Sequence, residues 1–249
     1  MMKKIFLIKT IFLTFILILG CNIKPDKAVL SEWKELETSV RDQKIIKKNA
    51  ELKLKSLLKK FSSFENLGFR EIEWAFPVLD KDQNLSKEKF SPDIEYGPYG
   101  VKGYDFFDGN RHGGHPAYDI FVPDNNLDSI NDKTGKYSSV AAVTDMLVLS
   151  LNNDWKPGSN LRGGNYIWLI NPKEKKLFYY AHLNEIFVKE GEFIKGGQVL
   201  GNIGRTGFLA YKKSSPTHLH LMVLDYKNGN LKPFDYSEKY QKKENSKPR

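Results

Sequence analysis

The chain has 249 residues, of which 40% are hydrophobic and 13% aromatic, so it can bury a core as one large domain or two small ones and is not a disordered protein. Its formal net charge is +9, with much of the basic excess near the two ends, which suits a surface close to anionic lipid or an anionic polymer. The sequence shows no helix-turn-helix, aromatic RNA-binding strand signature or zinc finger, so nucleic acid is not an expected partner.

Residues 1–21, MMKKIFLIKTIFLTFILILGC, combine two early lysines with an apolar run that ends at Leu19. This composition is typical of a secretory signal, and the run is short for a membrane span, which needs about 20 apolar residues. Cys21 is the only cysteine of the sequence, so no intramolecular disulfide forms. The stretch ILGC resembles a bacterial lipobox, which implies that residues 1–20 are a lipoprotein signal peptide, that Cys21 is lipidated, and that the protein is exported and held on a membrane face. An ordinary signal peptide or an uncleaved anchor is the alternative.

From Ala28 to Phe61 the chain is rich in Lys, Glu and Leu and lacks Gly and Pro. Apolar positions recur every three to four residues, which predicts an amphipathic helix; they are Leu30, Trp33, Leu36 or Glu37, and Val40. We interpret residues 21–62 as the lipidated cysteine plus a helical stalk. The same helix equally suits docking on the main domain or on a regulatory protein partner.

Residues 63–238 consist of short apolar or aromatic runs separated by turn residues, for example NYIWLINP, LFYYAHL and HLHLMVLDY. This pattern predicts a mostly β domain. Residues 239–249 form a polar, lysine-rich tail that we expect to fray.

All five histidines lie in the β-rich segment: His112, His115, His182, His218 and His220. In the stretch THLHLMV, His218 and His220 are two residues apart, so they share one face of the predicted strand. Two charged imidazoles there would repel, and burying both without partners would be costly, so a metal ion is one resolution. The alternative is one solvated histidine and one hydrogen-bonded core histidine.

His115 and Asp119 are four residues apart in RHGGHPAYDIFVP, where two glycines and Pro116 disfavour a helix. We expect a loop that enters a strand carrying Asp119, whose carboxylate would be costly to bury among apolar neighbours without a cation. A surface aspartate that ends a turn is the alternative. A histidine, an aspartate and a distant histidine are a plausible zinc set, because three protein ligands leave a fourth position open, as in catalytic zinc sites.

The stretch from Tyr179 to Val223 contains Tyr-x-His-Leu, then a GxxxGxxGxTG segment, then His-Leu-His. Together with the upstream His-x-x-x-Asp, this order and spacing resembles the lysostaphin/LytM-type zinc metallopeptidases over about 110 residues. The resemblance implies a compact antiparallel β-sheet metallopeptidase domain with the metal in a groove. We read the glycines of the segment as scaffold that permits tight turns or close strand packing.

The resemblance further implies that His115, Asp119 and His220 hold zinc, and that His182 and His218 are the catalytic histidines. Either of these two could be the general base. His112 lies three residues before His115 and could compete as a ligand, although only His115 has the family spacing to Asp119.

Two features depart from the family pattern. Leu221 and Met222 stand where Phe and Glu are usual after His-Leu-His, and the segment AYKKSS lengthens the loop before it. Because the ligands and both catalytic histidines are present, we expect these changes to affect substrate fit more than activity.

The resulting prediction is a zinc endopeptidase that hydrolyses peptide bonds in peptidoglycan stem or crossbridge peptides during cell wall remodelling. One alternative is a non-enzymatic adaptor that binds or activates other wall hydrolases, although family members of that kind have lost metal ligands. A zinc peptidase that acts on proteins is the other.

Overall fold

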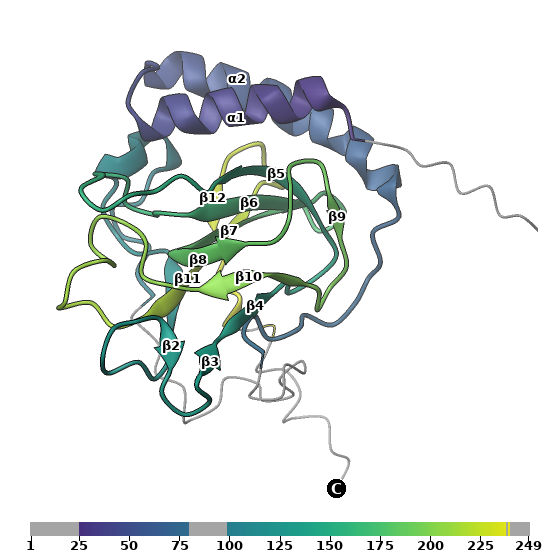
Figure 1. The fold of residues 1–249 in the computed structure, drawn as a ribbon. Helices are drawn as coiled ribbons and strands as arrows, with labels where there is room; N and C mark the ends of the chain where they lie inside the picture. The colour runs from purple at the N-terminus through teal and green to yellow at the C-terminus, as the bar shows by residue number, and fades with distance from the viewer. Residues whose placement is uncertain (1–24, 80–98, 238, 240–249) are drawn as a thin grey trace, which may run out of the picture.

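The computed structural model describes residues 25–79, 99–237 and 239 (Figure 1). The expected signal peptide, Cys21 and almost all of the basic tail therefore lie outside the described residues. Within the described ranges, no helix combines the length and the apolar character needed to cross a membrane.

Two α-helices open the described chain, α1 (Lys27–Arg41) and α2 (Lys47–Lys60), and two 3₁₀ helices follow, η1 (Phe61–Leu67) and η2 (Phe106–Arg111). The Asp26 side chain caps α1 by accepting a hydrogen bond from the Ala28 N–H at 2.8 Å. The expected single helix is broken after α1, where Gln43 takes a left-handed φ of 56°. The break turns α2 back against α1, so the two helices form a layer above the sheets (Figure 1).

The rest of the chain is mostly antiparallel β structure, as the sequence predicts. The larger sheet has the strand order β1-β11-β7-β6-β5-β9 with β12 beside β11, and the smaller sheet has the order β4-β10-β8. A separate hairpin pairs β2 with β3. The strands are β1 Ala117–Phe121, β2 Ile130–Asn131, β3 Lys136–Tyr137, β4 Ser139–Ala141, β5 Met146–Asn152, β6 Tyr166–Asn171, β7 Lys176–Ala181, β8 Leu183–Ile186, β9 Phe193–Ile194, β10 Val199–Ile203, β11 His218–Asp225 and β12 Lys232–Pro233.

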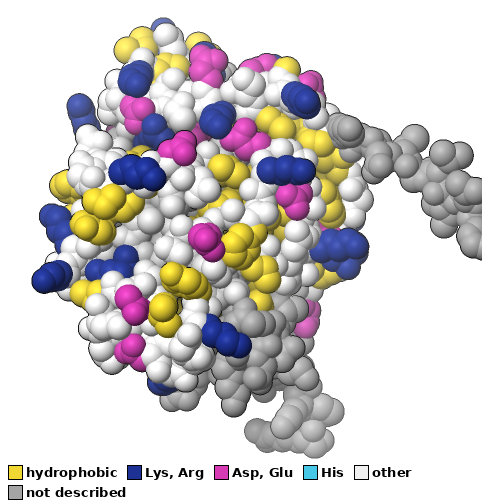
Figure 2. Space-filling model, viewed as in Figure 1, with side chains coloured by type: hydrophobic (Ala, Val, Ile, Leu, Met, Phe, Trp, Pro, Cys, Tyr) yellow, Lys and Arg dark blue, Asp and Glu magenta, His cyan; other side chains and the backbone are white. Residues whose placement is uncertain are grey.

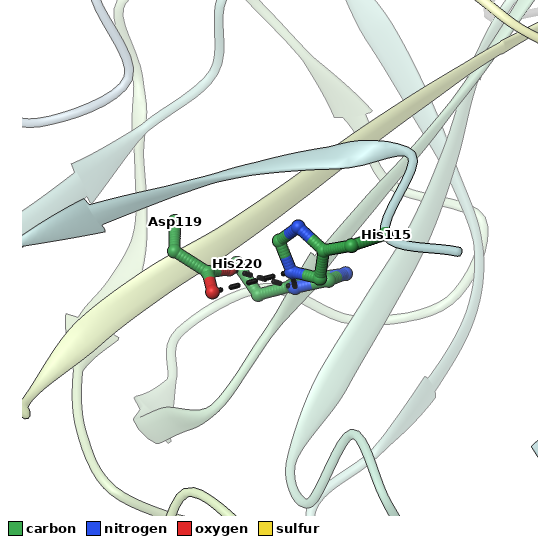
Figure 3. A group of neighbouring side chains, drawn as sticks. All are labelled: His115, Asp119 and His220. Carbon is green, nitrogen blue, oxygen red and sulfur yellow. Dashed lines mark hydrogen bonds and ion pairs between the residues drawn. The ribbon is translucent and has the colours of Figure 1, made fainter. Parts of the chain in front are cut away.

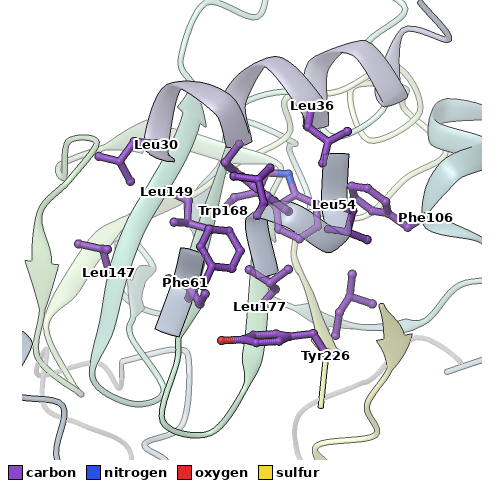
Figure 4. Packing of buried hydrophobic residues seen from close by; sticks show 14 of the residues in the cluster. Leu30, Leu36, Leu54, Phe61, Phe106, Leu147, Leu149, Trp168, Leu177 and Tyr226 are labelled. Atoms are coloured by element: carbon purple, nitrogen blue, oxygen red, sulfur yellow. The ribbon is translucent and has the colours of Figure 1, made fainter. Parts of the chain in front are cut away.

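Alternate residues of the larger sheet enter two separate hydrophobic cores. On β5, Leu147 and Leu149 pack in the core beneath the helices, whereas Met146 and Val148 pack in the core on the opposite face. Figure 4 shows the helix-side core, in which side chains of α1, α2 and η1 meet those of the sheet.

Trp33 is the centre of this helix-side core. Its side chain is fully buried, and its ring lies 5.5 Å from Trp168, 5.8 Å from Phe61 and 6.2 Å from Phe106 between centroids. The indole N–H also donates to Ser150 Oγ at 3.2 Å. Helix α1 therefore docks on the β domain and shares its core. Of the two arrangements considered from the sequence, this is docking on the main domain and not a free stalk.

Charge is mixed on the face seen in Figure 2, where Lys and Arg side chains are interspersed with Asp and Glu. Several helix lysines have acidic partners, for example Lys34 with Glu190 at 2.6 Å and Lys60 with Glu32 at 2.6 Å. Such exposed pairs are worth about 0–1 kcal/mol each. They show that the positive charge of the helices is partly neutralised on the protein itself.

Candidate metal centre

Asp119 and His220 meet because their strands pair. In the antiparallel register of β1 with β11, Asp119 lies directly opposite His220, and opposed residues project from the same face. His220 Nδ1 is 2.9 Å from Asp119 Oδ1. The alternation of β11 places this pair on the face that also carries Met222 in the helix-side core.

His115 reaches the same point from the loop before β1. Its backbone is fixed by two hydrogen bonds with Gly100, of 2.6 Å and 2.8 Å. Its Nε2 then lies 3.2 Å from Asp119 Oδ2 and 3.2 Å from His220 Nδ1, so the three side chains converge (Figure 3). The structure thus brings together the three residues expected to hold a metal.

The donor atoms of these residues fit a zinc ion. One ligand atom from each residue lies within 4.8 Å of the others, and the closest pairs are 2.9–3.2 Å apart. Ligands about 2.0–2.2 Å from a tetrahedral zinc ion lie about 3.3–3.6 Å from one another, so small adjustments would accommodate it. Two imidazole nitrogens and one carboxylate oxygen also match the ligand types that zinc prefers.

His182 and His218 flank the cluster, with ring centroids 4.8 Å apart. His182 Nδ1 lies 2.8 Å from the Thr206 carbonyl oxygen, and His218 Nδ1 lies 2.7 Å from the Pro216 carbonyl oxygen. A carbonyl oxygen only accepts, so each Nδ1 carries the hydrogen and each neutral ring keeps the lone pair on Nε2. Both rings therefore have the tautomer that a general base requires.

The backbone around His182 is tightly constrained. His182 itself has a left-handed φ of 64°, and its N–H donates to the Gly163 carbonyl at 3.0 Å. Gly207 packs against it with a φ of 118°, and a Cβ at Gly207 would lie 2.4 Å from the Arg162 carbonyl oxygen and 2.9 Å from His182 Nδ1. At this position the glycine of the GxxxGxxGxTG segment is required by close packing, as the sequence predicts.

Burial and hydrogen bonding tune the charges of the site. Burial, reinforced by the neighbouring histidines, holds the pKa of His182 well below its ordinary value, so the ring is neutral. Burial also lowers the pKa of His220. Burial alone raises the pKa of Asp119, but hydrogen bonds from His115 and His220 outweigh it and hold that pKa below the ordinary range. Within the cluster, an ionised Asp119 carboxylate thus faces His220, whose lowered pKa favours the neutral imidazole that binds a cation.

A cavity of about 280 Å³ contains the cluster and both flanking histidines. His112 lies in its wall, where its ring meets Tyr104 at 5.0 Å between centroids, and it is not part of the His115, Asp119 and His220 group. The structure thus separates His112 from the cluster.

Sequence reasoning missed several residues that line this cavity: Glu37 and Arg41 on α1, Arg162 on the loop before β6, and the aromatic floor of Tyr166, Trp168 and Tyr179. One signal was present, because Glu37 falls on the apolar stripe of α1, where a charged residue is unusual. Arg162 had no such signal.

An antiparallel β domain that gathers a His-Asp-His cluster and two further histidines in one cavity is of the metallopeptidase class. Comparison with known proteins agrees, since residues 128–233 match the family described as peptidase family M23. This part of the β-rich domain is therefore similar to peptidase family M23, and lysostaphin and a glycyl-glycine endopeptidase are among the similar proteins.

Individual relatives match only part of their own length. Lysostaphin from Staphylococcus staphylolyticus is 37% identical over 89 residues, which cover 34% of this chain and 18% of that protein. The glycyl-glycine endopeptidase ALE-1 from Staphylococcus capitis is 30% identical over 127 residues, which cover 50% of this chain and 26% of that protein. The solved structure of lysostaphin from Staphylococcus simulans aligns with a TM-score of 0.38 and 22% identity, covering 63% of this chain and 55% of that one. The chain thus spans about a fifth to a quarter of the length of these curated relatives.

Proposed function

We propose that this protein is a zinc-dependent endopeptidase that hydrolyses peptide bonds in peptidoglycan stem or crossbridge peptides during cell wall remodelling. The observation that carries the proposal is the convergence of His115, Asp119 and His220 in a cavity shared with His182 and His218. The match of residues 128–233 to peptidase family M23 and the similarity to lysostaphin and a glycyl-glycine endopeptidase support the substrate class.

In this proposal His115, Asp119 and His220 would hold a zinc ion, which when bound would supply Lewis-acid chemistry to a water molecule and a peptide carbonyl. His182 and His218 are the catalytic histidines. Each offers an Nε2 lone pair that can accept a proton from the attacking water, and the imidazolium so formed can protonate the leaving amine. Hydrogen bonds from Nδ1 to backbone carbonyls keep both rings in this tautomer.

The proposed place of action is outside the cytoplasm, with the chain exported and lipid-anchored to a bacterial membrane through Cys21. The basic start, apolar run and ILGC stretch of the sequence support this assignment. A lipid anchor would keep the domain within reach of the wall.

The test is digestion of peptidoglycan by purified, zinc-loaded protein, compared with digestion of a denatured protein, each with and without a chelator. We expect muropeptides to be released from peptidoglycan only in the absence of chelator, and mass spectrometry of the fragments would name the bond that is cut. Cleavage of the denatured protein alone would indicate a general protein peptidase. Wall binding without metal-dependent release from folded, zinc-loaded protein would contradict the proposal and favour a non-enzymatic adaptor.

A further inference from the structure

Helix α1 forms one wall of the cavity that contains the metal cluster. Glu37, Val40 and Arg41, on its last turns, line the cavity together with the five site residues. The backbone of Gly109 abuts this helix end, because a Cβ at Gly109 would lie 2.3 Å from the Val40 carbonyl oxygen. We call this space the α1 cavity, defined by Glu37, Arg41, Tyr104, Arg162 and Tyr179 beside the metal cluster.

Arg162 is a cation of the α1 cavity that has no carboxylate partner among the described residues. Its Nη1 donates to the backbone carbonyls of Asn110 at 3.0 Å and His112 at 3.4 Å, which leaves Nε and Nη2 without an acceptor among the described residues. Arg41 differs, because Asp42 accepts from its Nε at 2.6 Å and from its Nη2 at 2.9 Å. Arg162 therefore offers free N–H groups and an unneutralised charge next to the catalytic centre.

Two phenol hydroxyls add further donors. The side chains of Tyr104 and Tyr179 line the cavity. Neither hydroxyl has a hydrogen-bond partner among the described residues, and both hydroxyls remain accessible to solvent. Burial raises the pKa of both tyrosines above the ordinary value, so both hydroxyls keep their hydrogen. Each can therefore donate to an acceptor that enters the cavity.

Glu37, the acidic residue of the α1 wall, does not neutralise Arg162. Its carboxylate is turned toward Tyr166, whose hydroxyl lies 3.0 Å away, and toward Ser150, whose hydroxyl donates to it at 3.4 Å. Burial raises its pKa to about 7, so at neutral pH a large fraction of Glu37 carries no charge. The donors and the charge of the cavity thus favour an anionic ligand.

We propose that the α1 cavity is a substrate subsite for a peptide residue that carries a free carboxylate, with the Arg162 guanidinium as the group that binds it. The proposal rests on the peptidase function proposed above and specifies its substrate. Sites for drug-sized ligands are about 300–1,000 Å³, so a cavity of about 280 Å³ suits one residue of a peptide. The carboxylate could be the carboxyl terminus of the peptide or an acidic side chain beside the scissile bond.

The experiment uses a synthetic peptidoglycan stem peptide in three forms: unmodified, with the carboxyl terminus amidated, and with the side-chain carboxylate amidated. We expect one amidation to raise KM about tenfold to hundredfold, since a hydrogen-bonded ion contributes about 1.5–3 kcal/mol. The form that loses affinity names the source of the carboxylate. Equal KM values for all three forms would overturn the subsite.

Two variants test whether Arg162 binds the carboxylate of the peptide or only supports the local backbone. In Arg162→Gln we expect the preference for the unmodified peptide to disappear, whereas Arg111→Gln, which removes an exposed arginine from η2, should keep it. If Arg162 only braces the backbone at Asn110 and His112, its variant would weaken all three peptides alike and keep the preference. That result would contradict the proposal.

Binding of the three peptides is also measured by calorimetry on zinc-loaded protein, so that the two proposals fail separately. Binding that depends on the carboxylate, without any cleavage, would overturn the peptidase function and support the subsite. Cleavage of all three forms with equal affinity would support the peptidase function and overturn the subsite.

Discussion

His218 and His220 are two residues apart on β11, yet their distances to the other residues of the His115, Asp119 and His220 cluster differ. His220 faces Asp119 at 2.9 Å and His115 at 3.2 Å, whereas His218 Nε2 stands 3.7 Å from the nearest Asp119 oxygen. The first ring is inside the ligand cluster, and the second is beside it.

From this difference we predict that His220→Ala loses bound zinc, whereas His218→Ala keeps zinc and loses cleavage by about 10²- to 10⁴-fold, the usual contribution of a general acid–base group. Metal analysis of the purified variants and the rate of muropeptide release measure the two effects. Equal loss of zinc in both variants would refute the division of roles.

Burial of Glu37 lowers the stability of the fold when its carboxylate is charged, so the effect depends on pH. Its pKa is raised from 4.5 to about 7 by burial, which the Arg41 charge and hydrogen bonds from Tyr166 and Ser150 only partly offset. The folded state therefore holds this proton more tightly than the unfolded state. The contribution of protonated Glu37 to the free energy of unfolding is fully present below pH 4.5 and is lost as the pH rises through about 7.

We predict that Glu37→Gln, which does not titrate, becomes more stable relative to the unsubstituted protein as the pH rises from 4.5 to 8. The relative gain is on the order of 3 kcal/mol, because each pKa unit corresponds to about 1.4 kcal/mol. Denaturant unfolding of both proteins across this range measures it. A difference that is constant with pH would show that Glu37 titrates normally.

At the scale of elements, α1 is part of the β domain. Trp33 joins it to β6 through Trp168 and to η2 through Phe106, and its indole N–H is bonded to Ser150 on β5. The helix whose last turns line the cavity around the histidine cluster is thus anchored in the core (Figure 4).

We predict that Trp33→Ala lowers the free energy of unfolding of the whole domain by about 3–5 kcal/mol, the usual cost of removing a large buried aromatic side chain. Leu52→Ala is the matched control, since Leu52 on α2 is 62% exposed and surface substitutions change stability by about 0.5 kcal/mol or less. Denaturant unfolding followed by near-UV circular dichroism reports on the β domain. An unchanged midpoint in Trp33→Ala would mean that the helices are an independent stalk.

At the scale of the whole molecule, the cluster of His115, Asp119 and His220 connects segments that are distant in the chain. Asp119 and His220 are 101 residues apart, and His115 and His220 are 105 apart. A ligand held by all three stabilises the folded state, because the unfolded chain does not present them together.

We predict that a chelator lowers the thermal midpoint of the zinc-loaded protein. At a free zinc concentration 1,000 times the dissociation constant, bound zinc contributes about 4 kcal/mol. Differential scanning calorimetry with and without chelator measures the change, and His220→Ala is the control because it should show none. If the protein is shown to hold zinc and its thermal midpoint does not change with chelator, that result would contradict a zinc site formed jointly by His115, Asp119 and His220.

Much of the site was predictable because its signals are local in sequence. Strand alternation places His218 and His220 on one face of the strand, independent of the rest of the fold. Gly201 and Gly207 lie where the neighbouring backbone is too close for a side chain. The mostly β class followed from runs bounded by turn residues. The break between α1 and α2 was not predictable, since no Gly or Pro marks the left-handed Gln43.

By itself, the sequence predicted the class of fold and proposed which side chains carry the chemistry, because residue type and short-range spacing are properties of neighbouring positions. Only the tertiary structure decided what covers the apolar stripe of α1, and with it the entry of Glu37, Arg41 and Arg162 into the cavity that contains the histidine cluster. The physical reason is that burial of an apolar face is non-directional: the stripe requires a partner surface, and only the packed shapes of distant segments select which one.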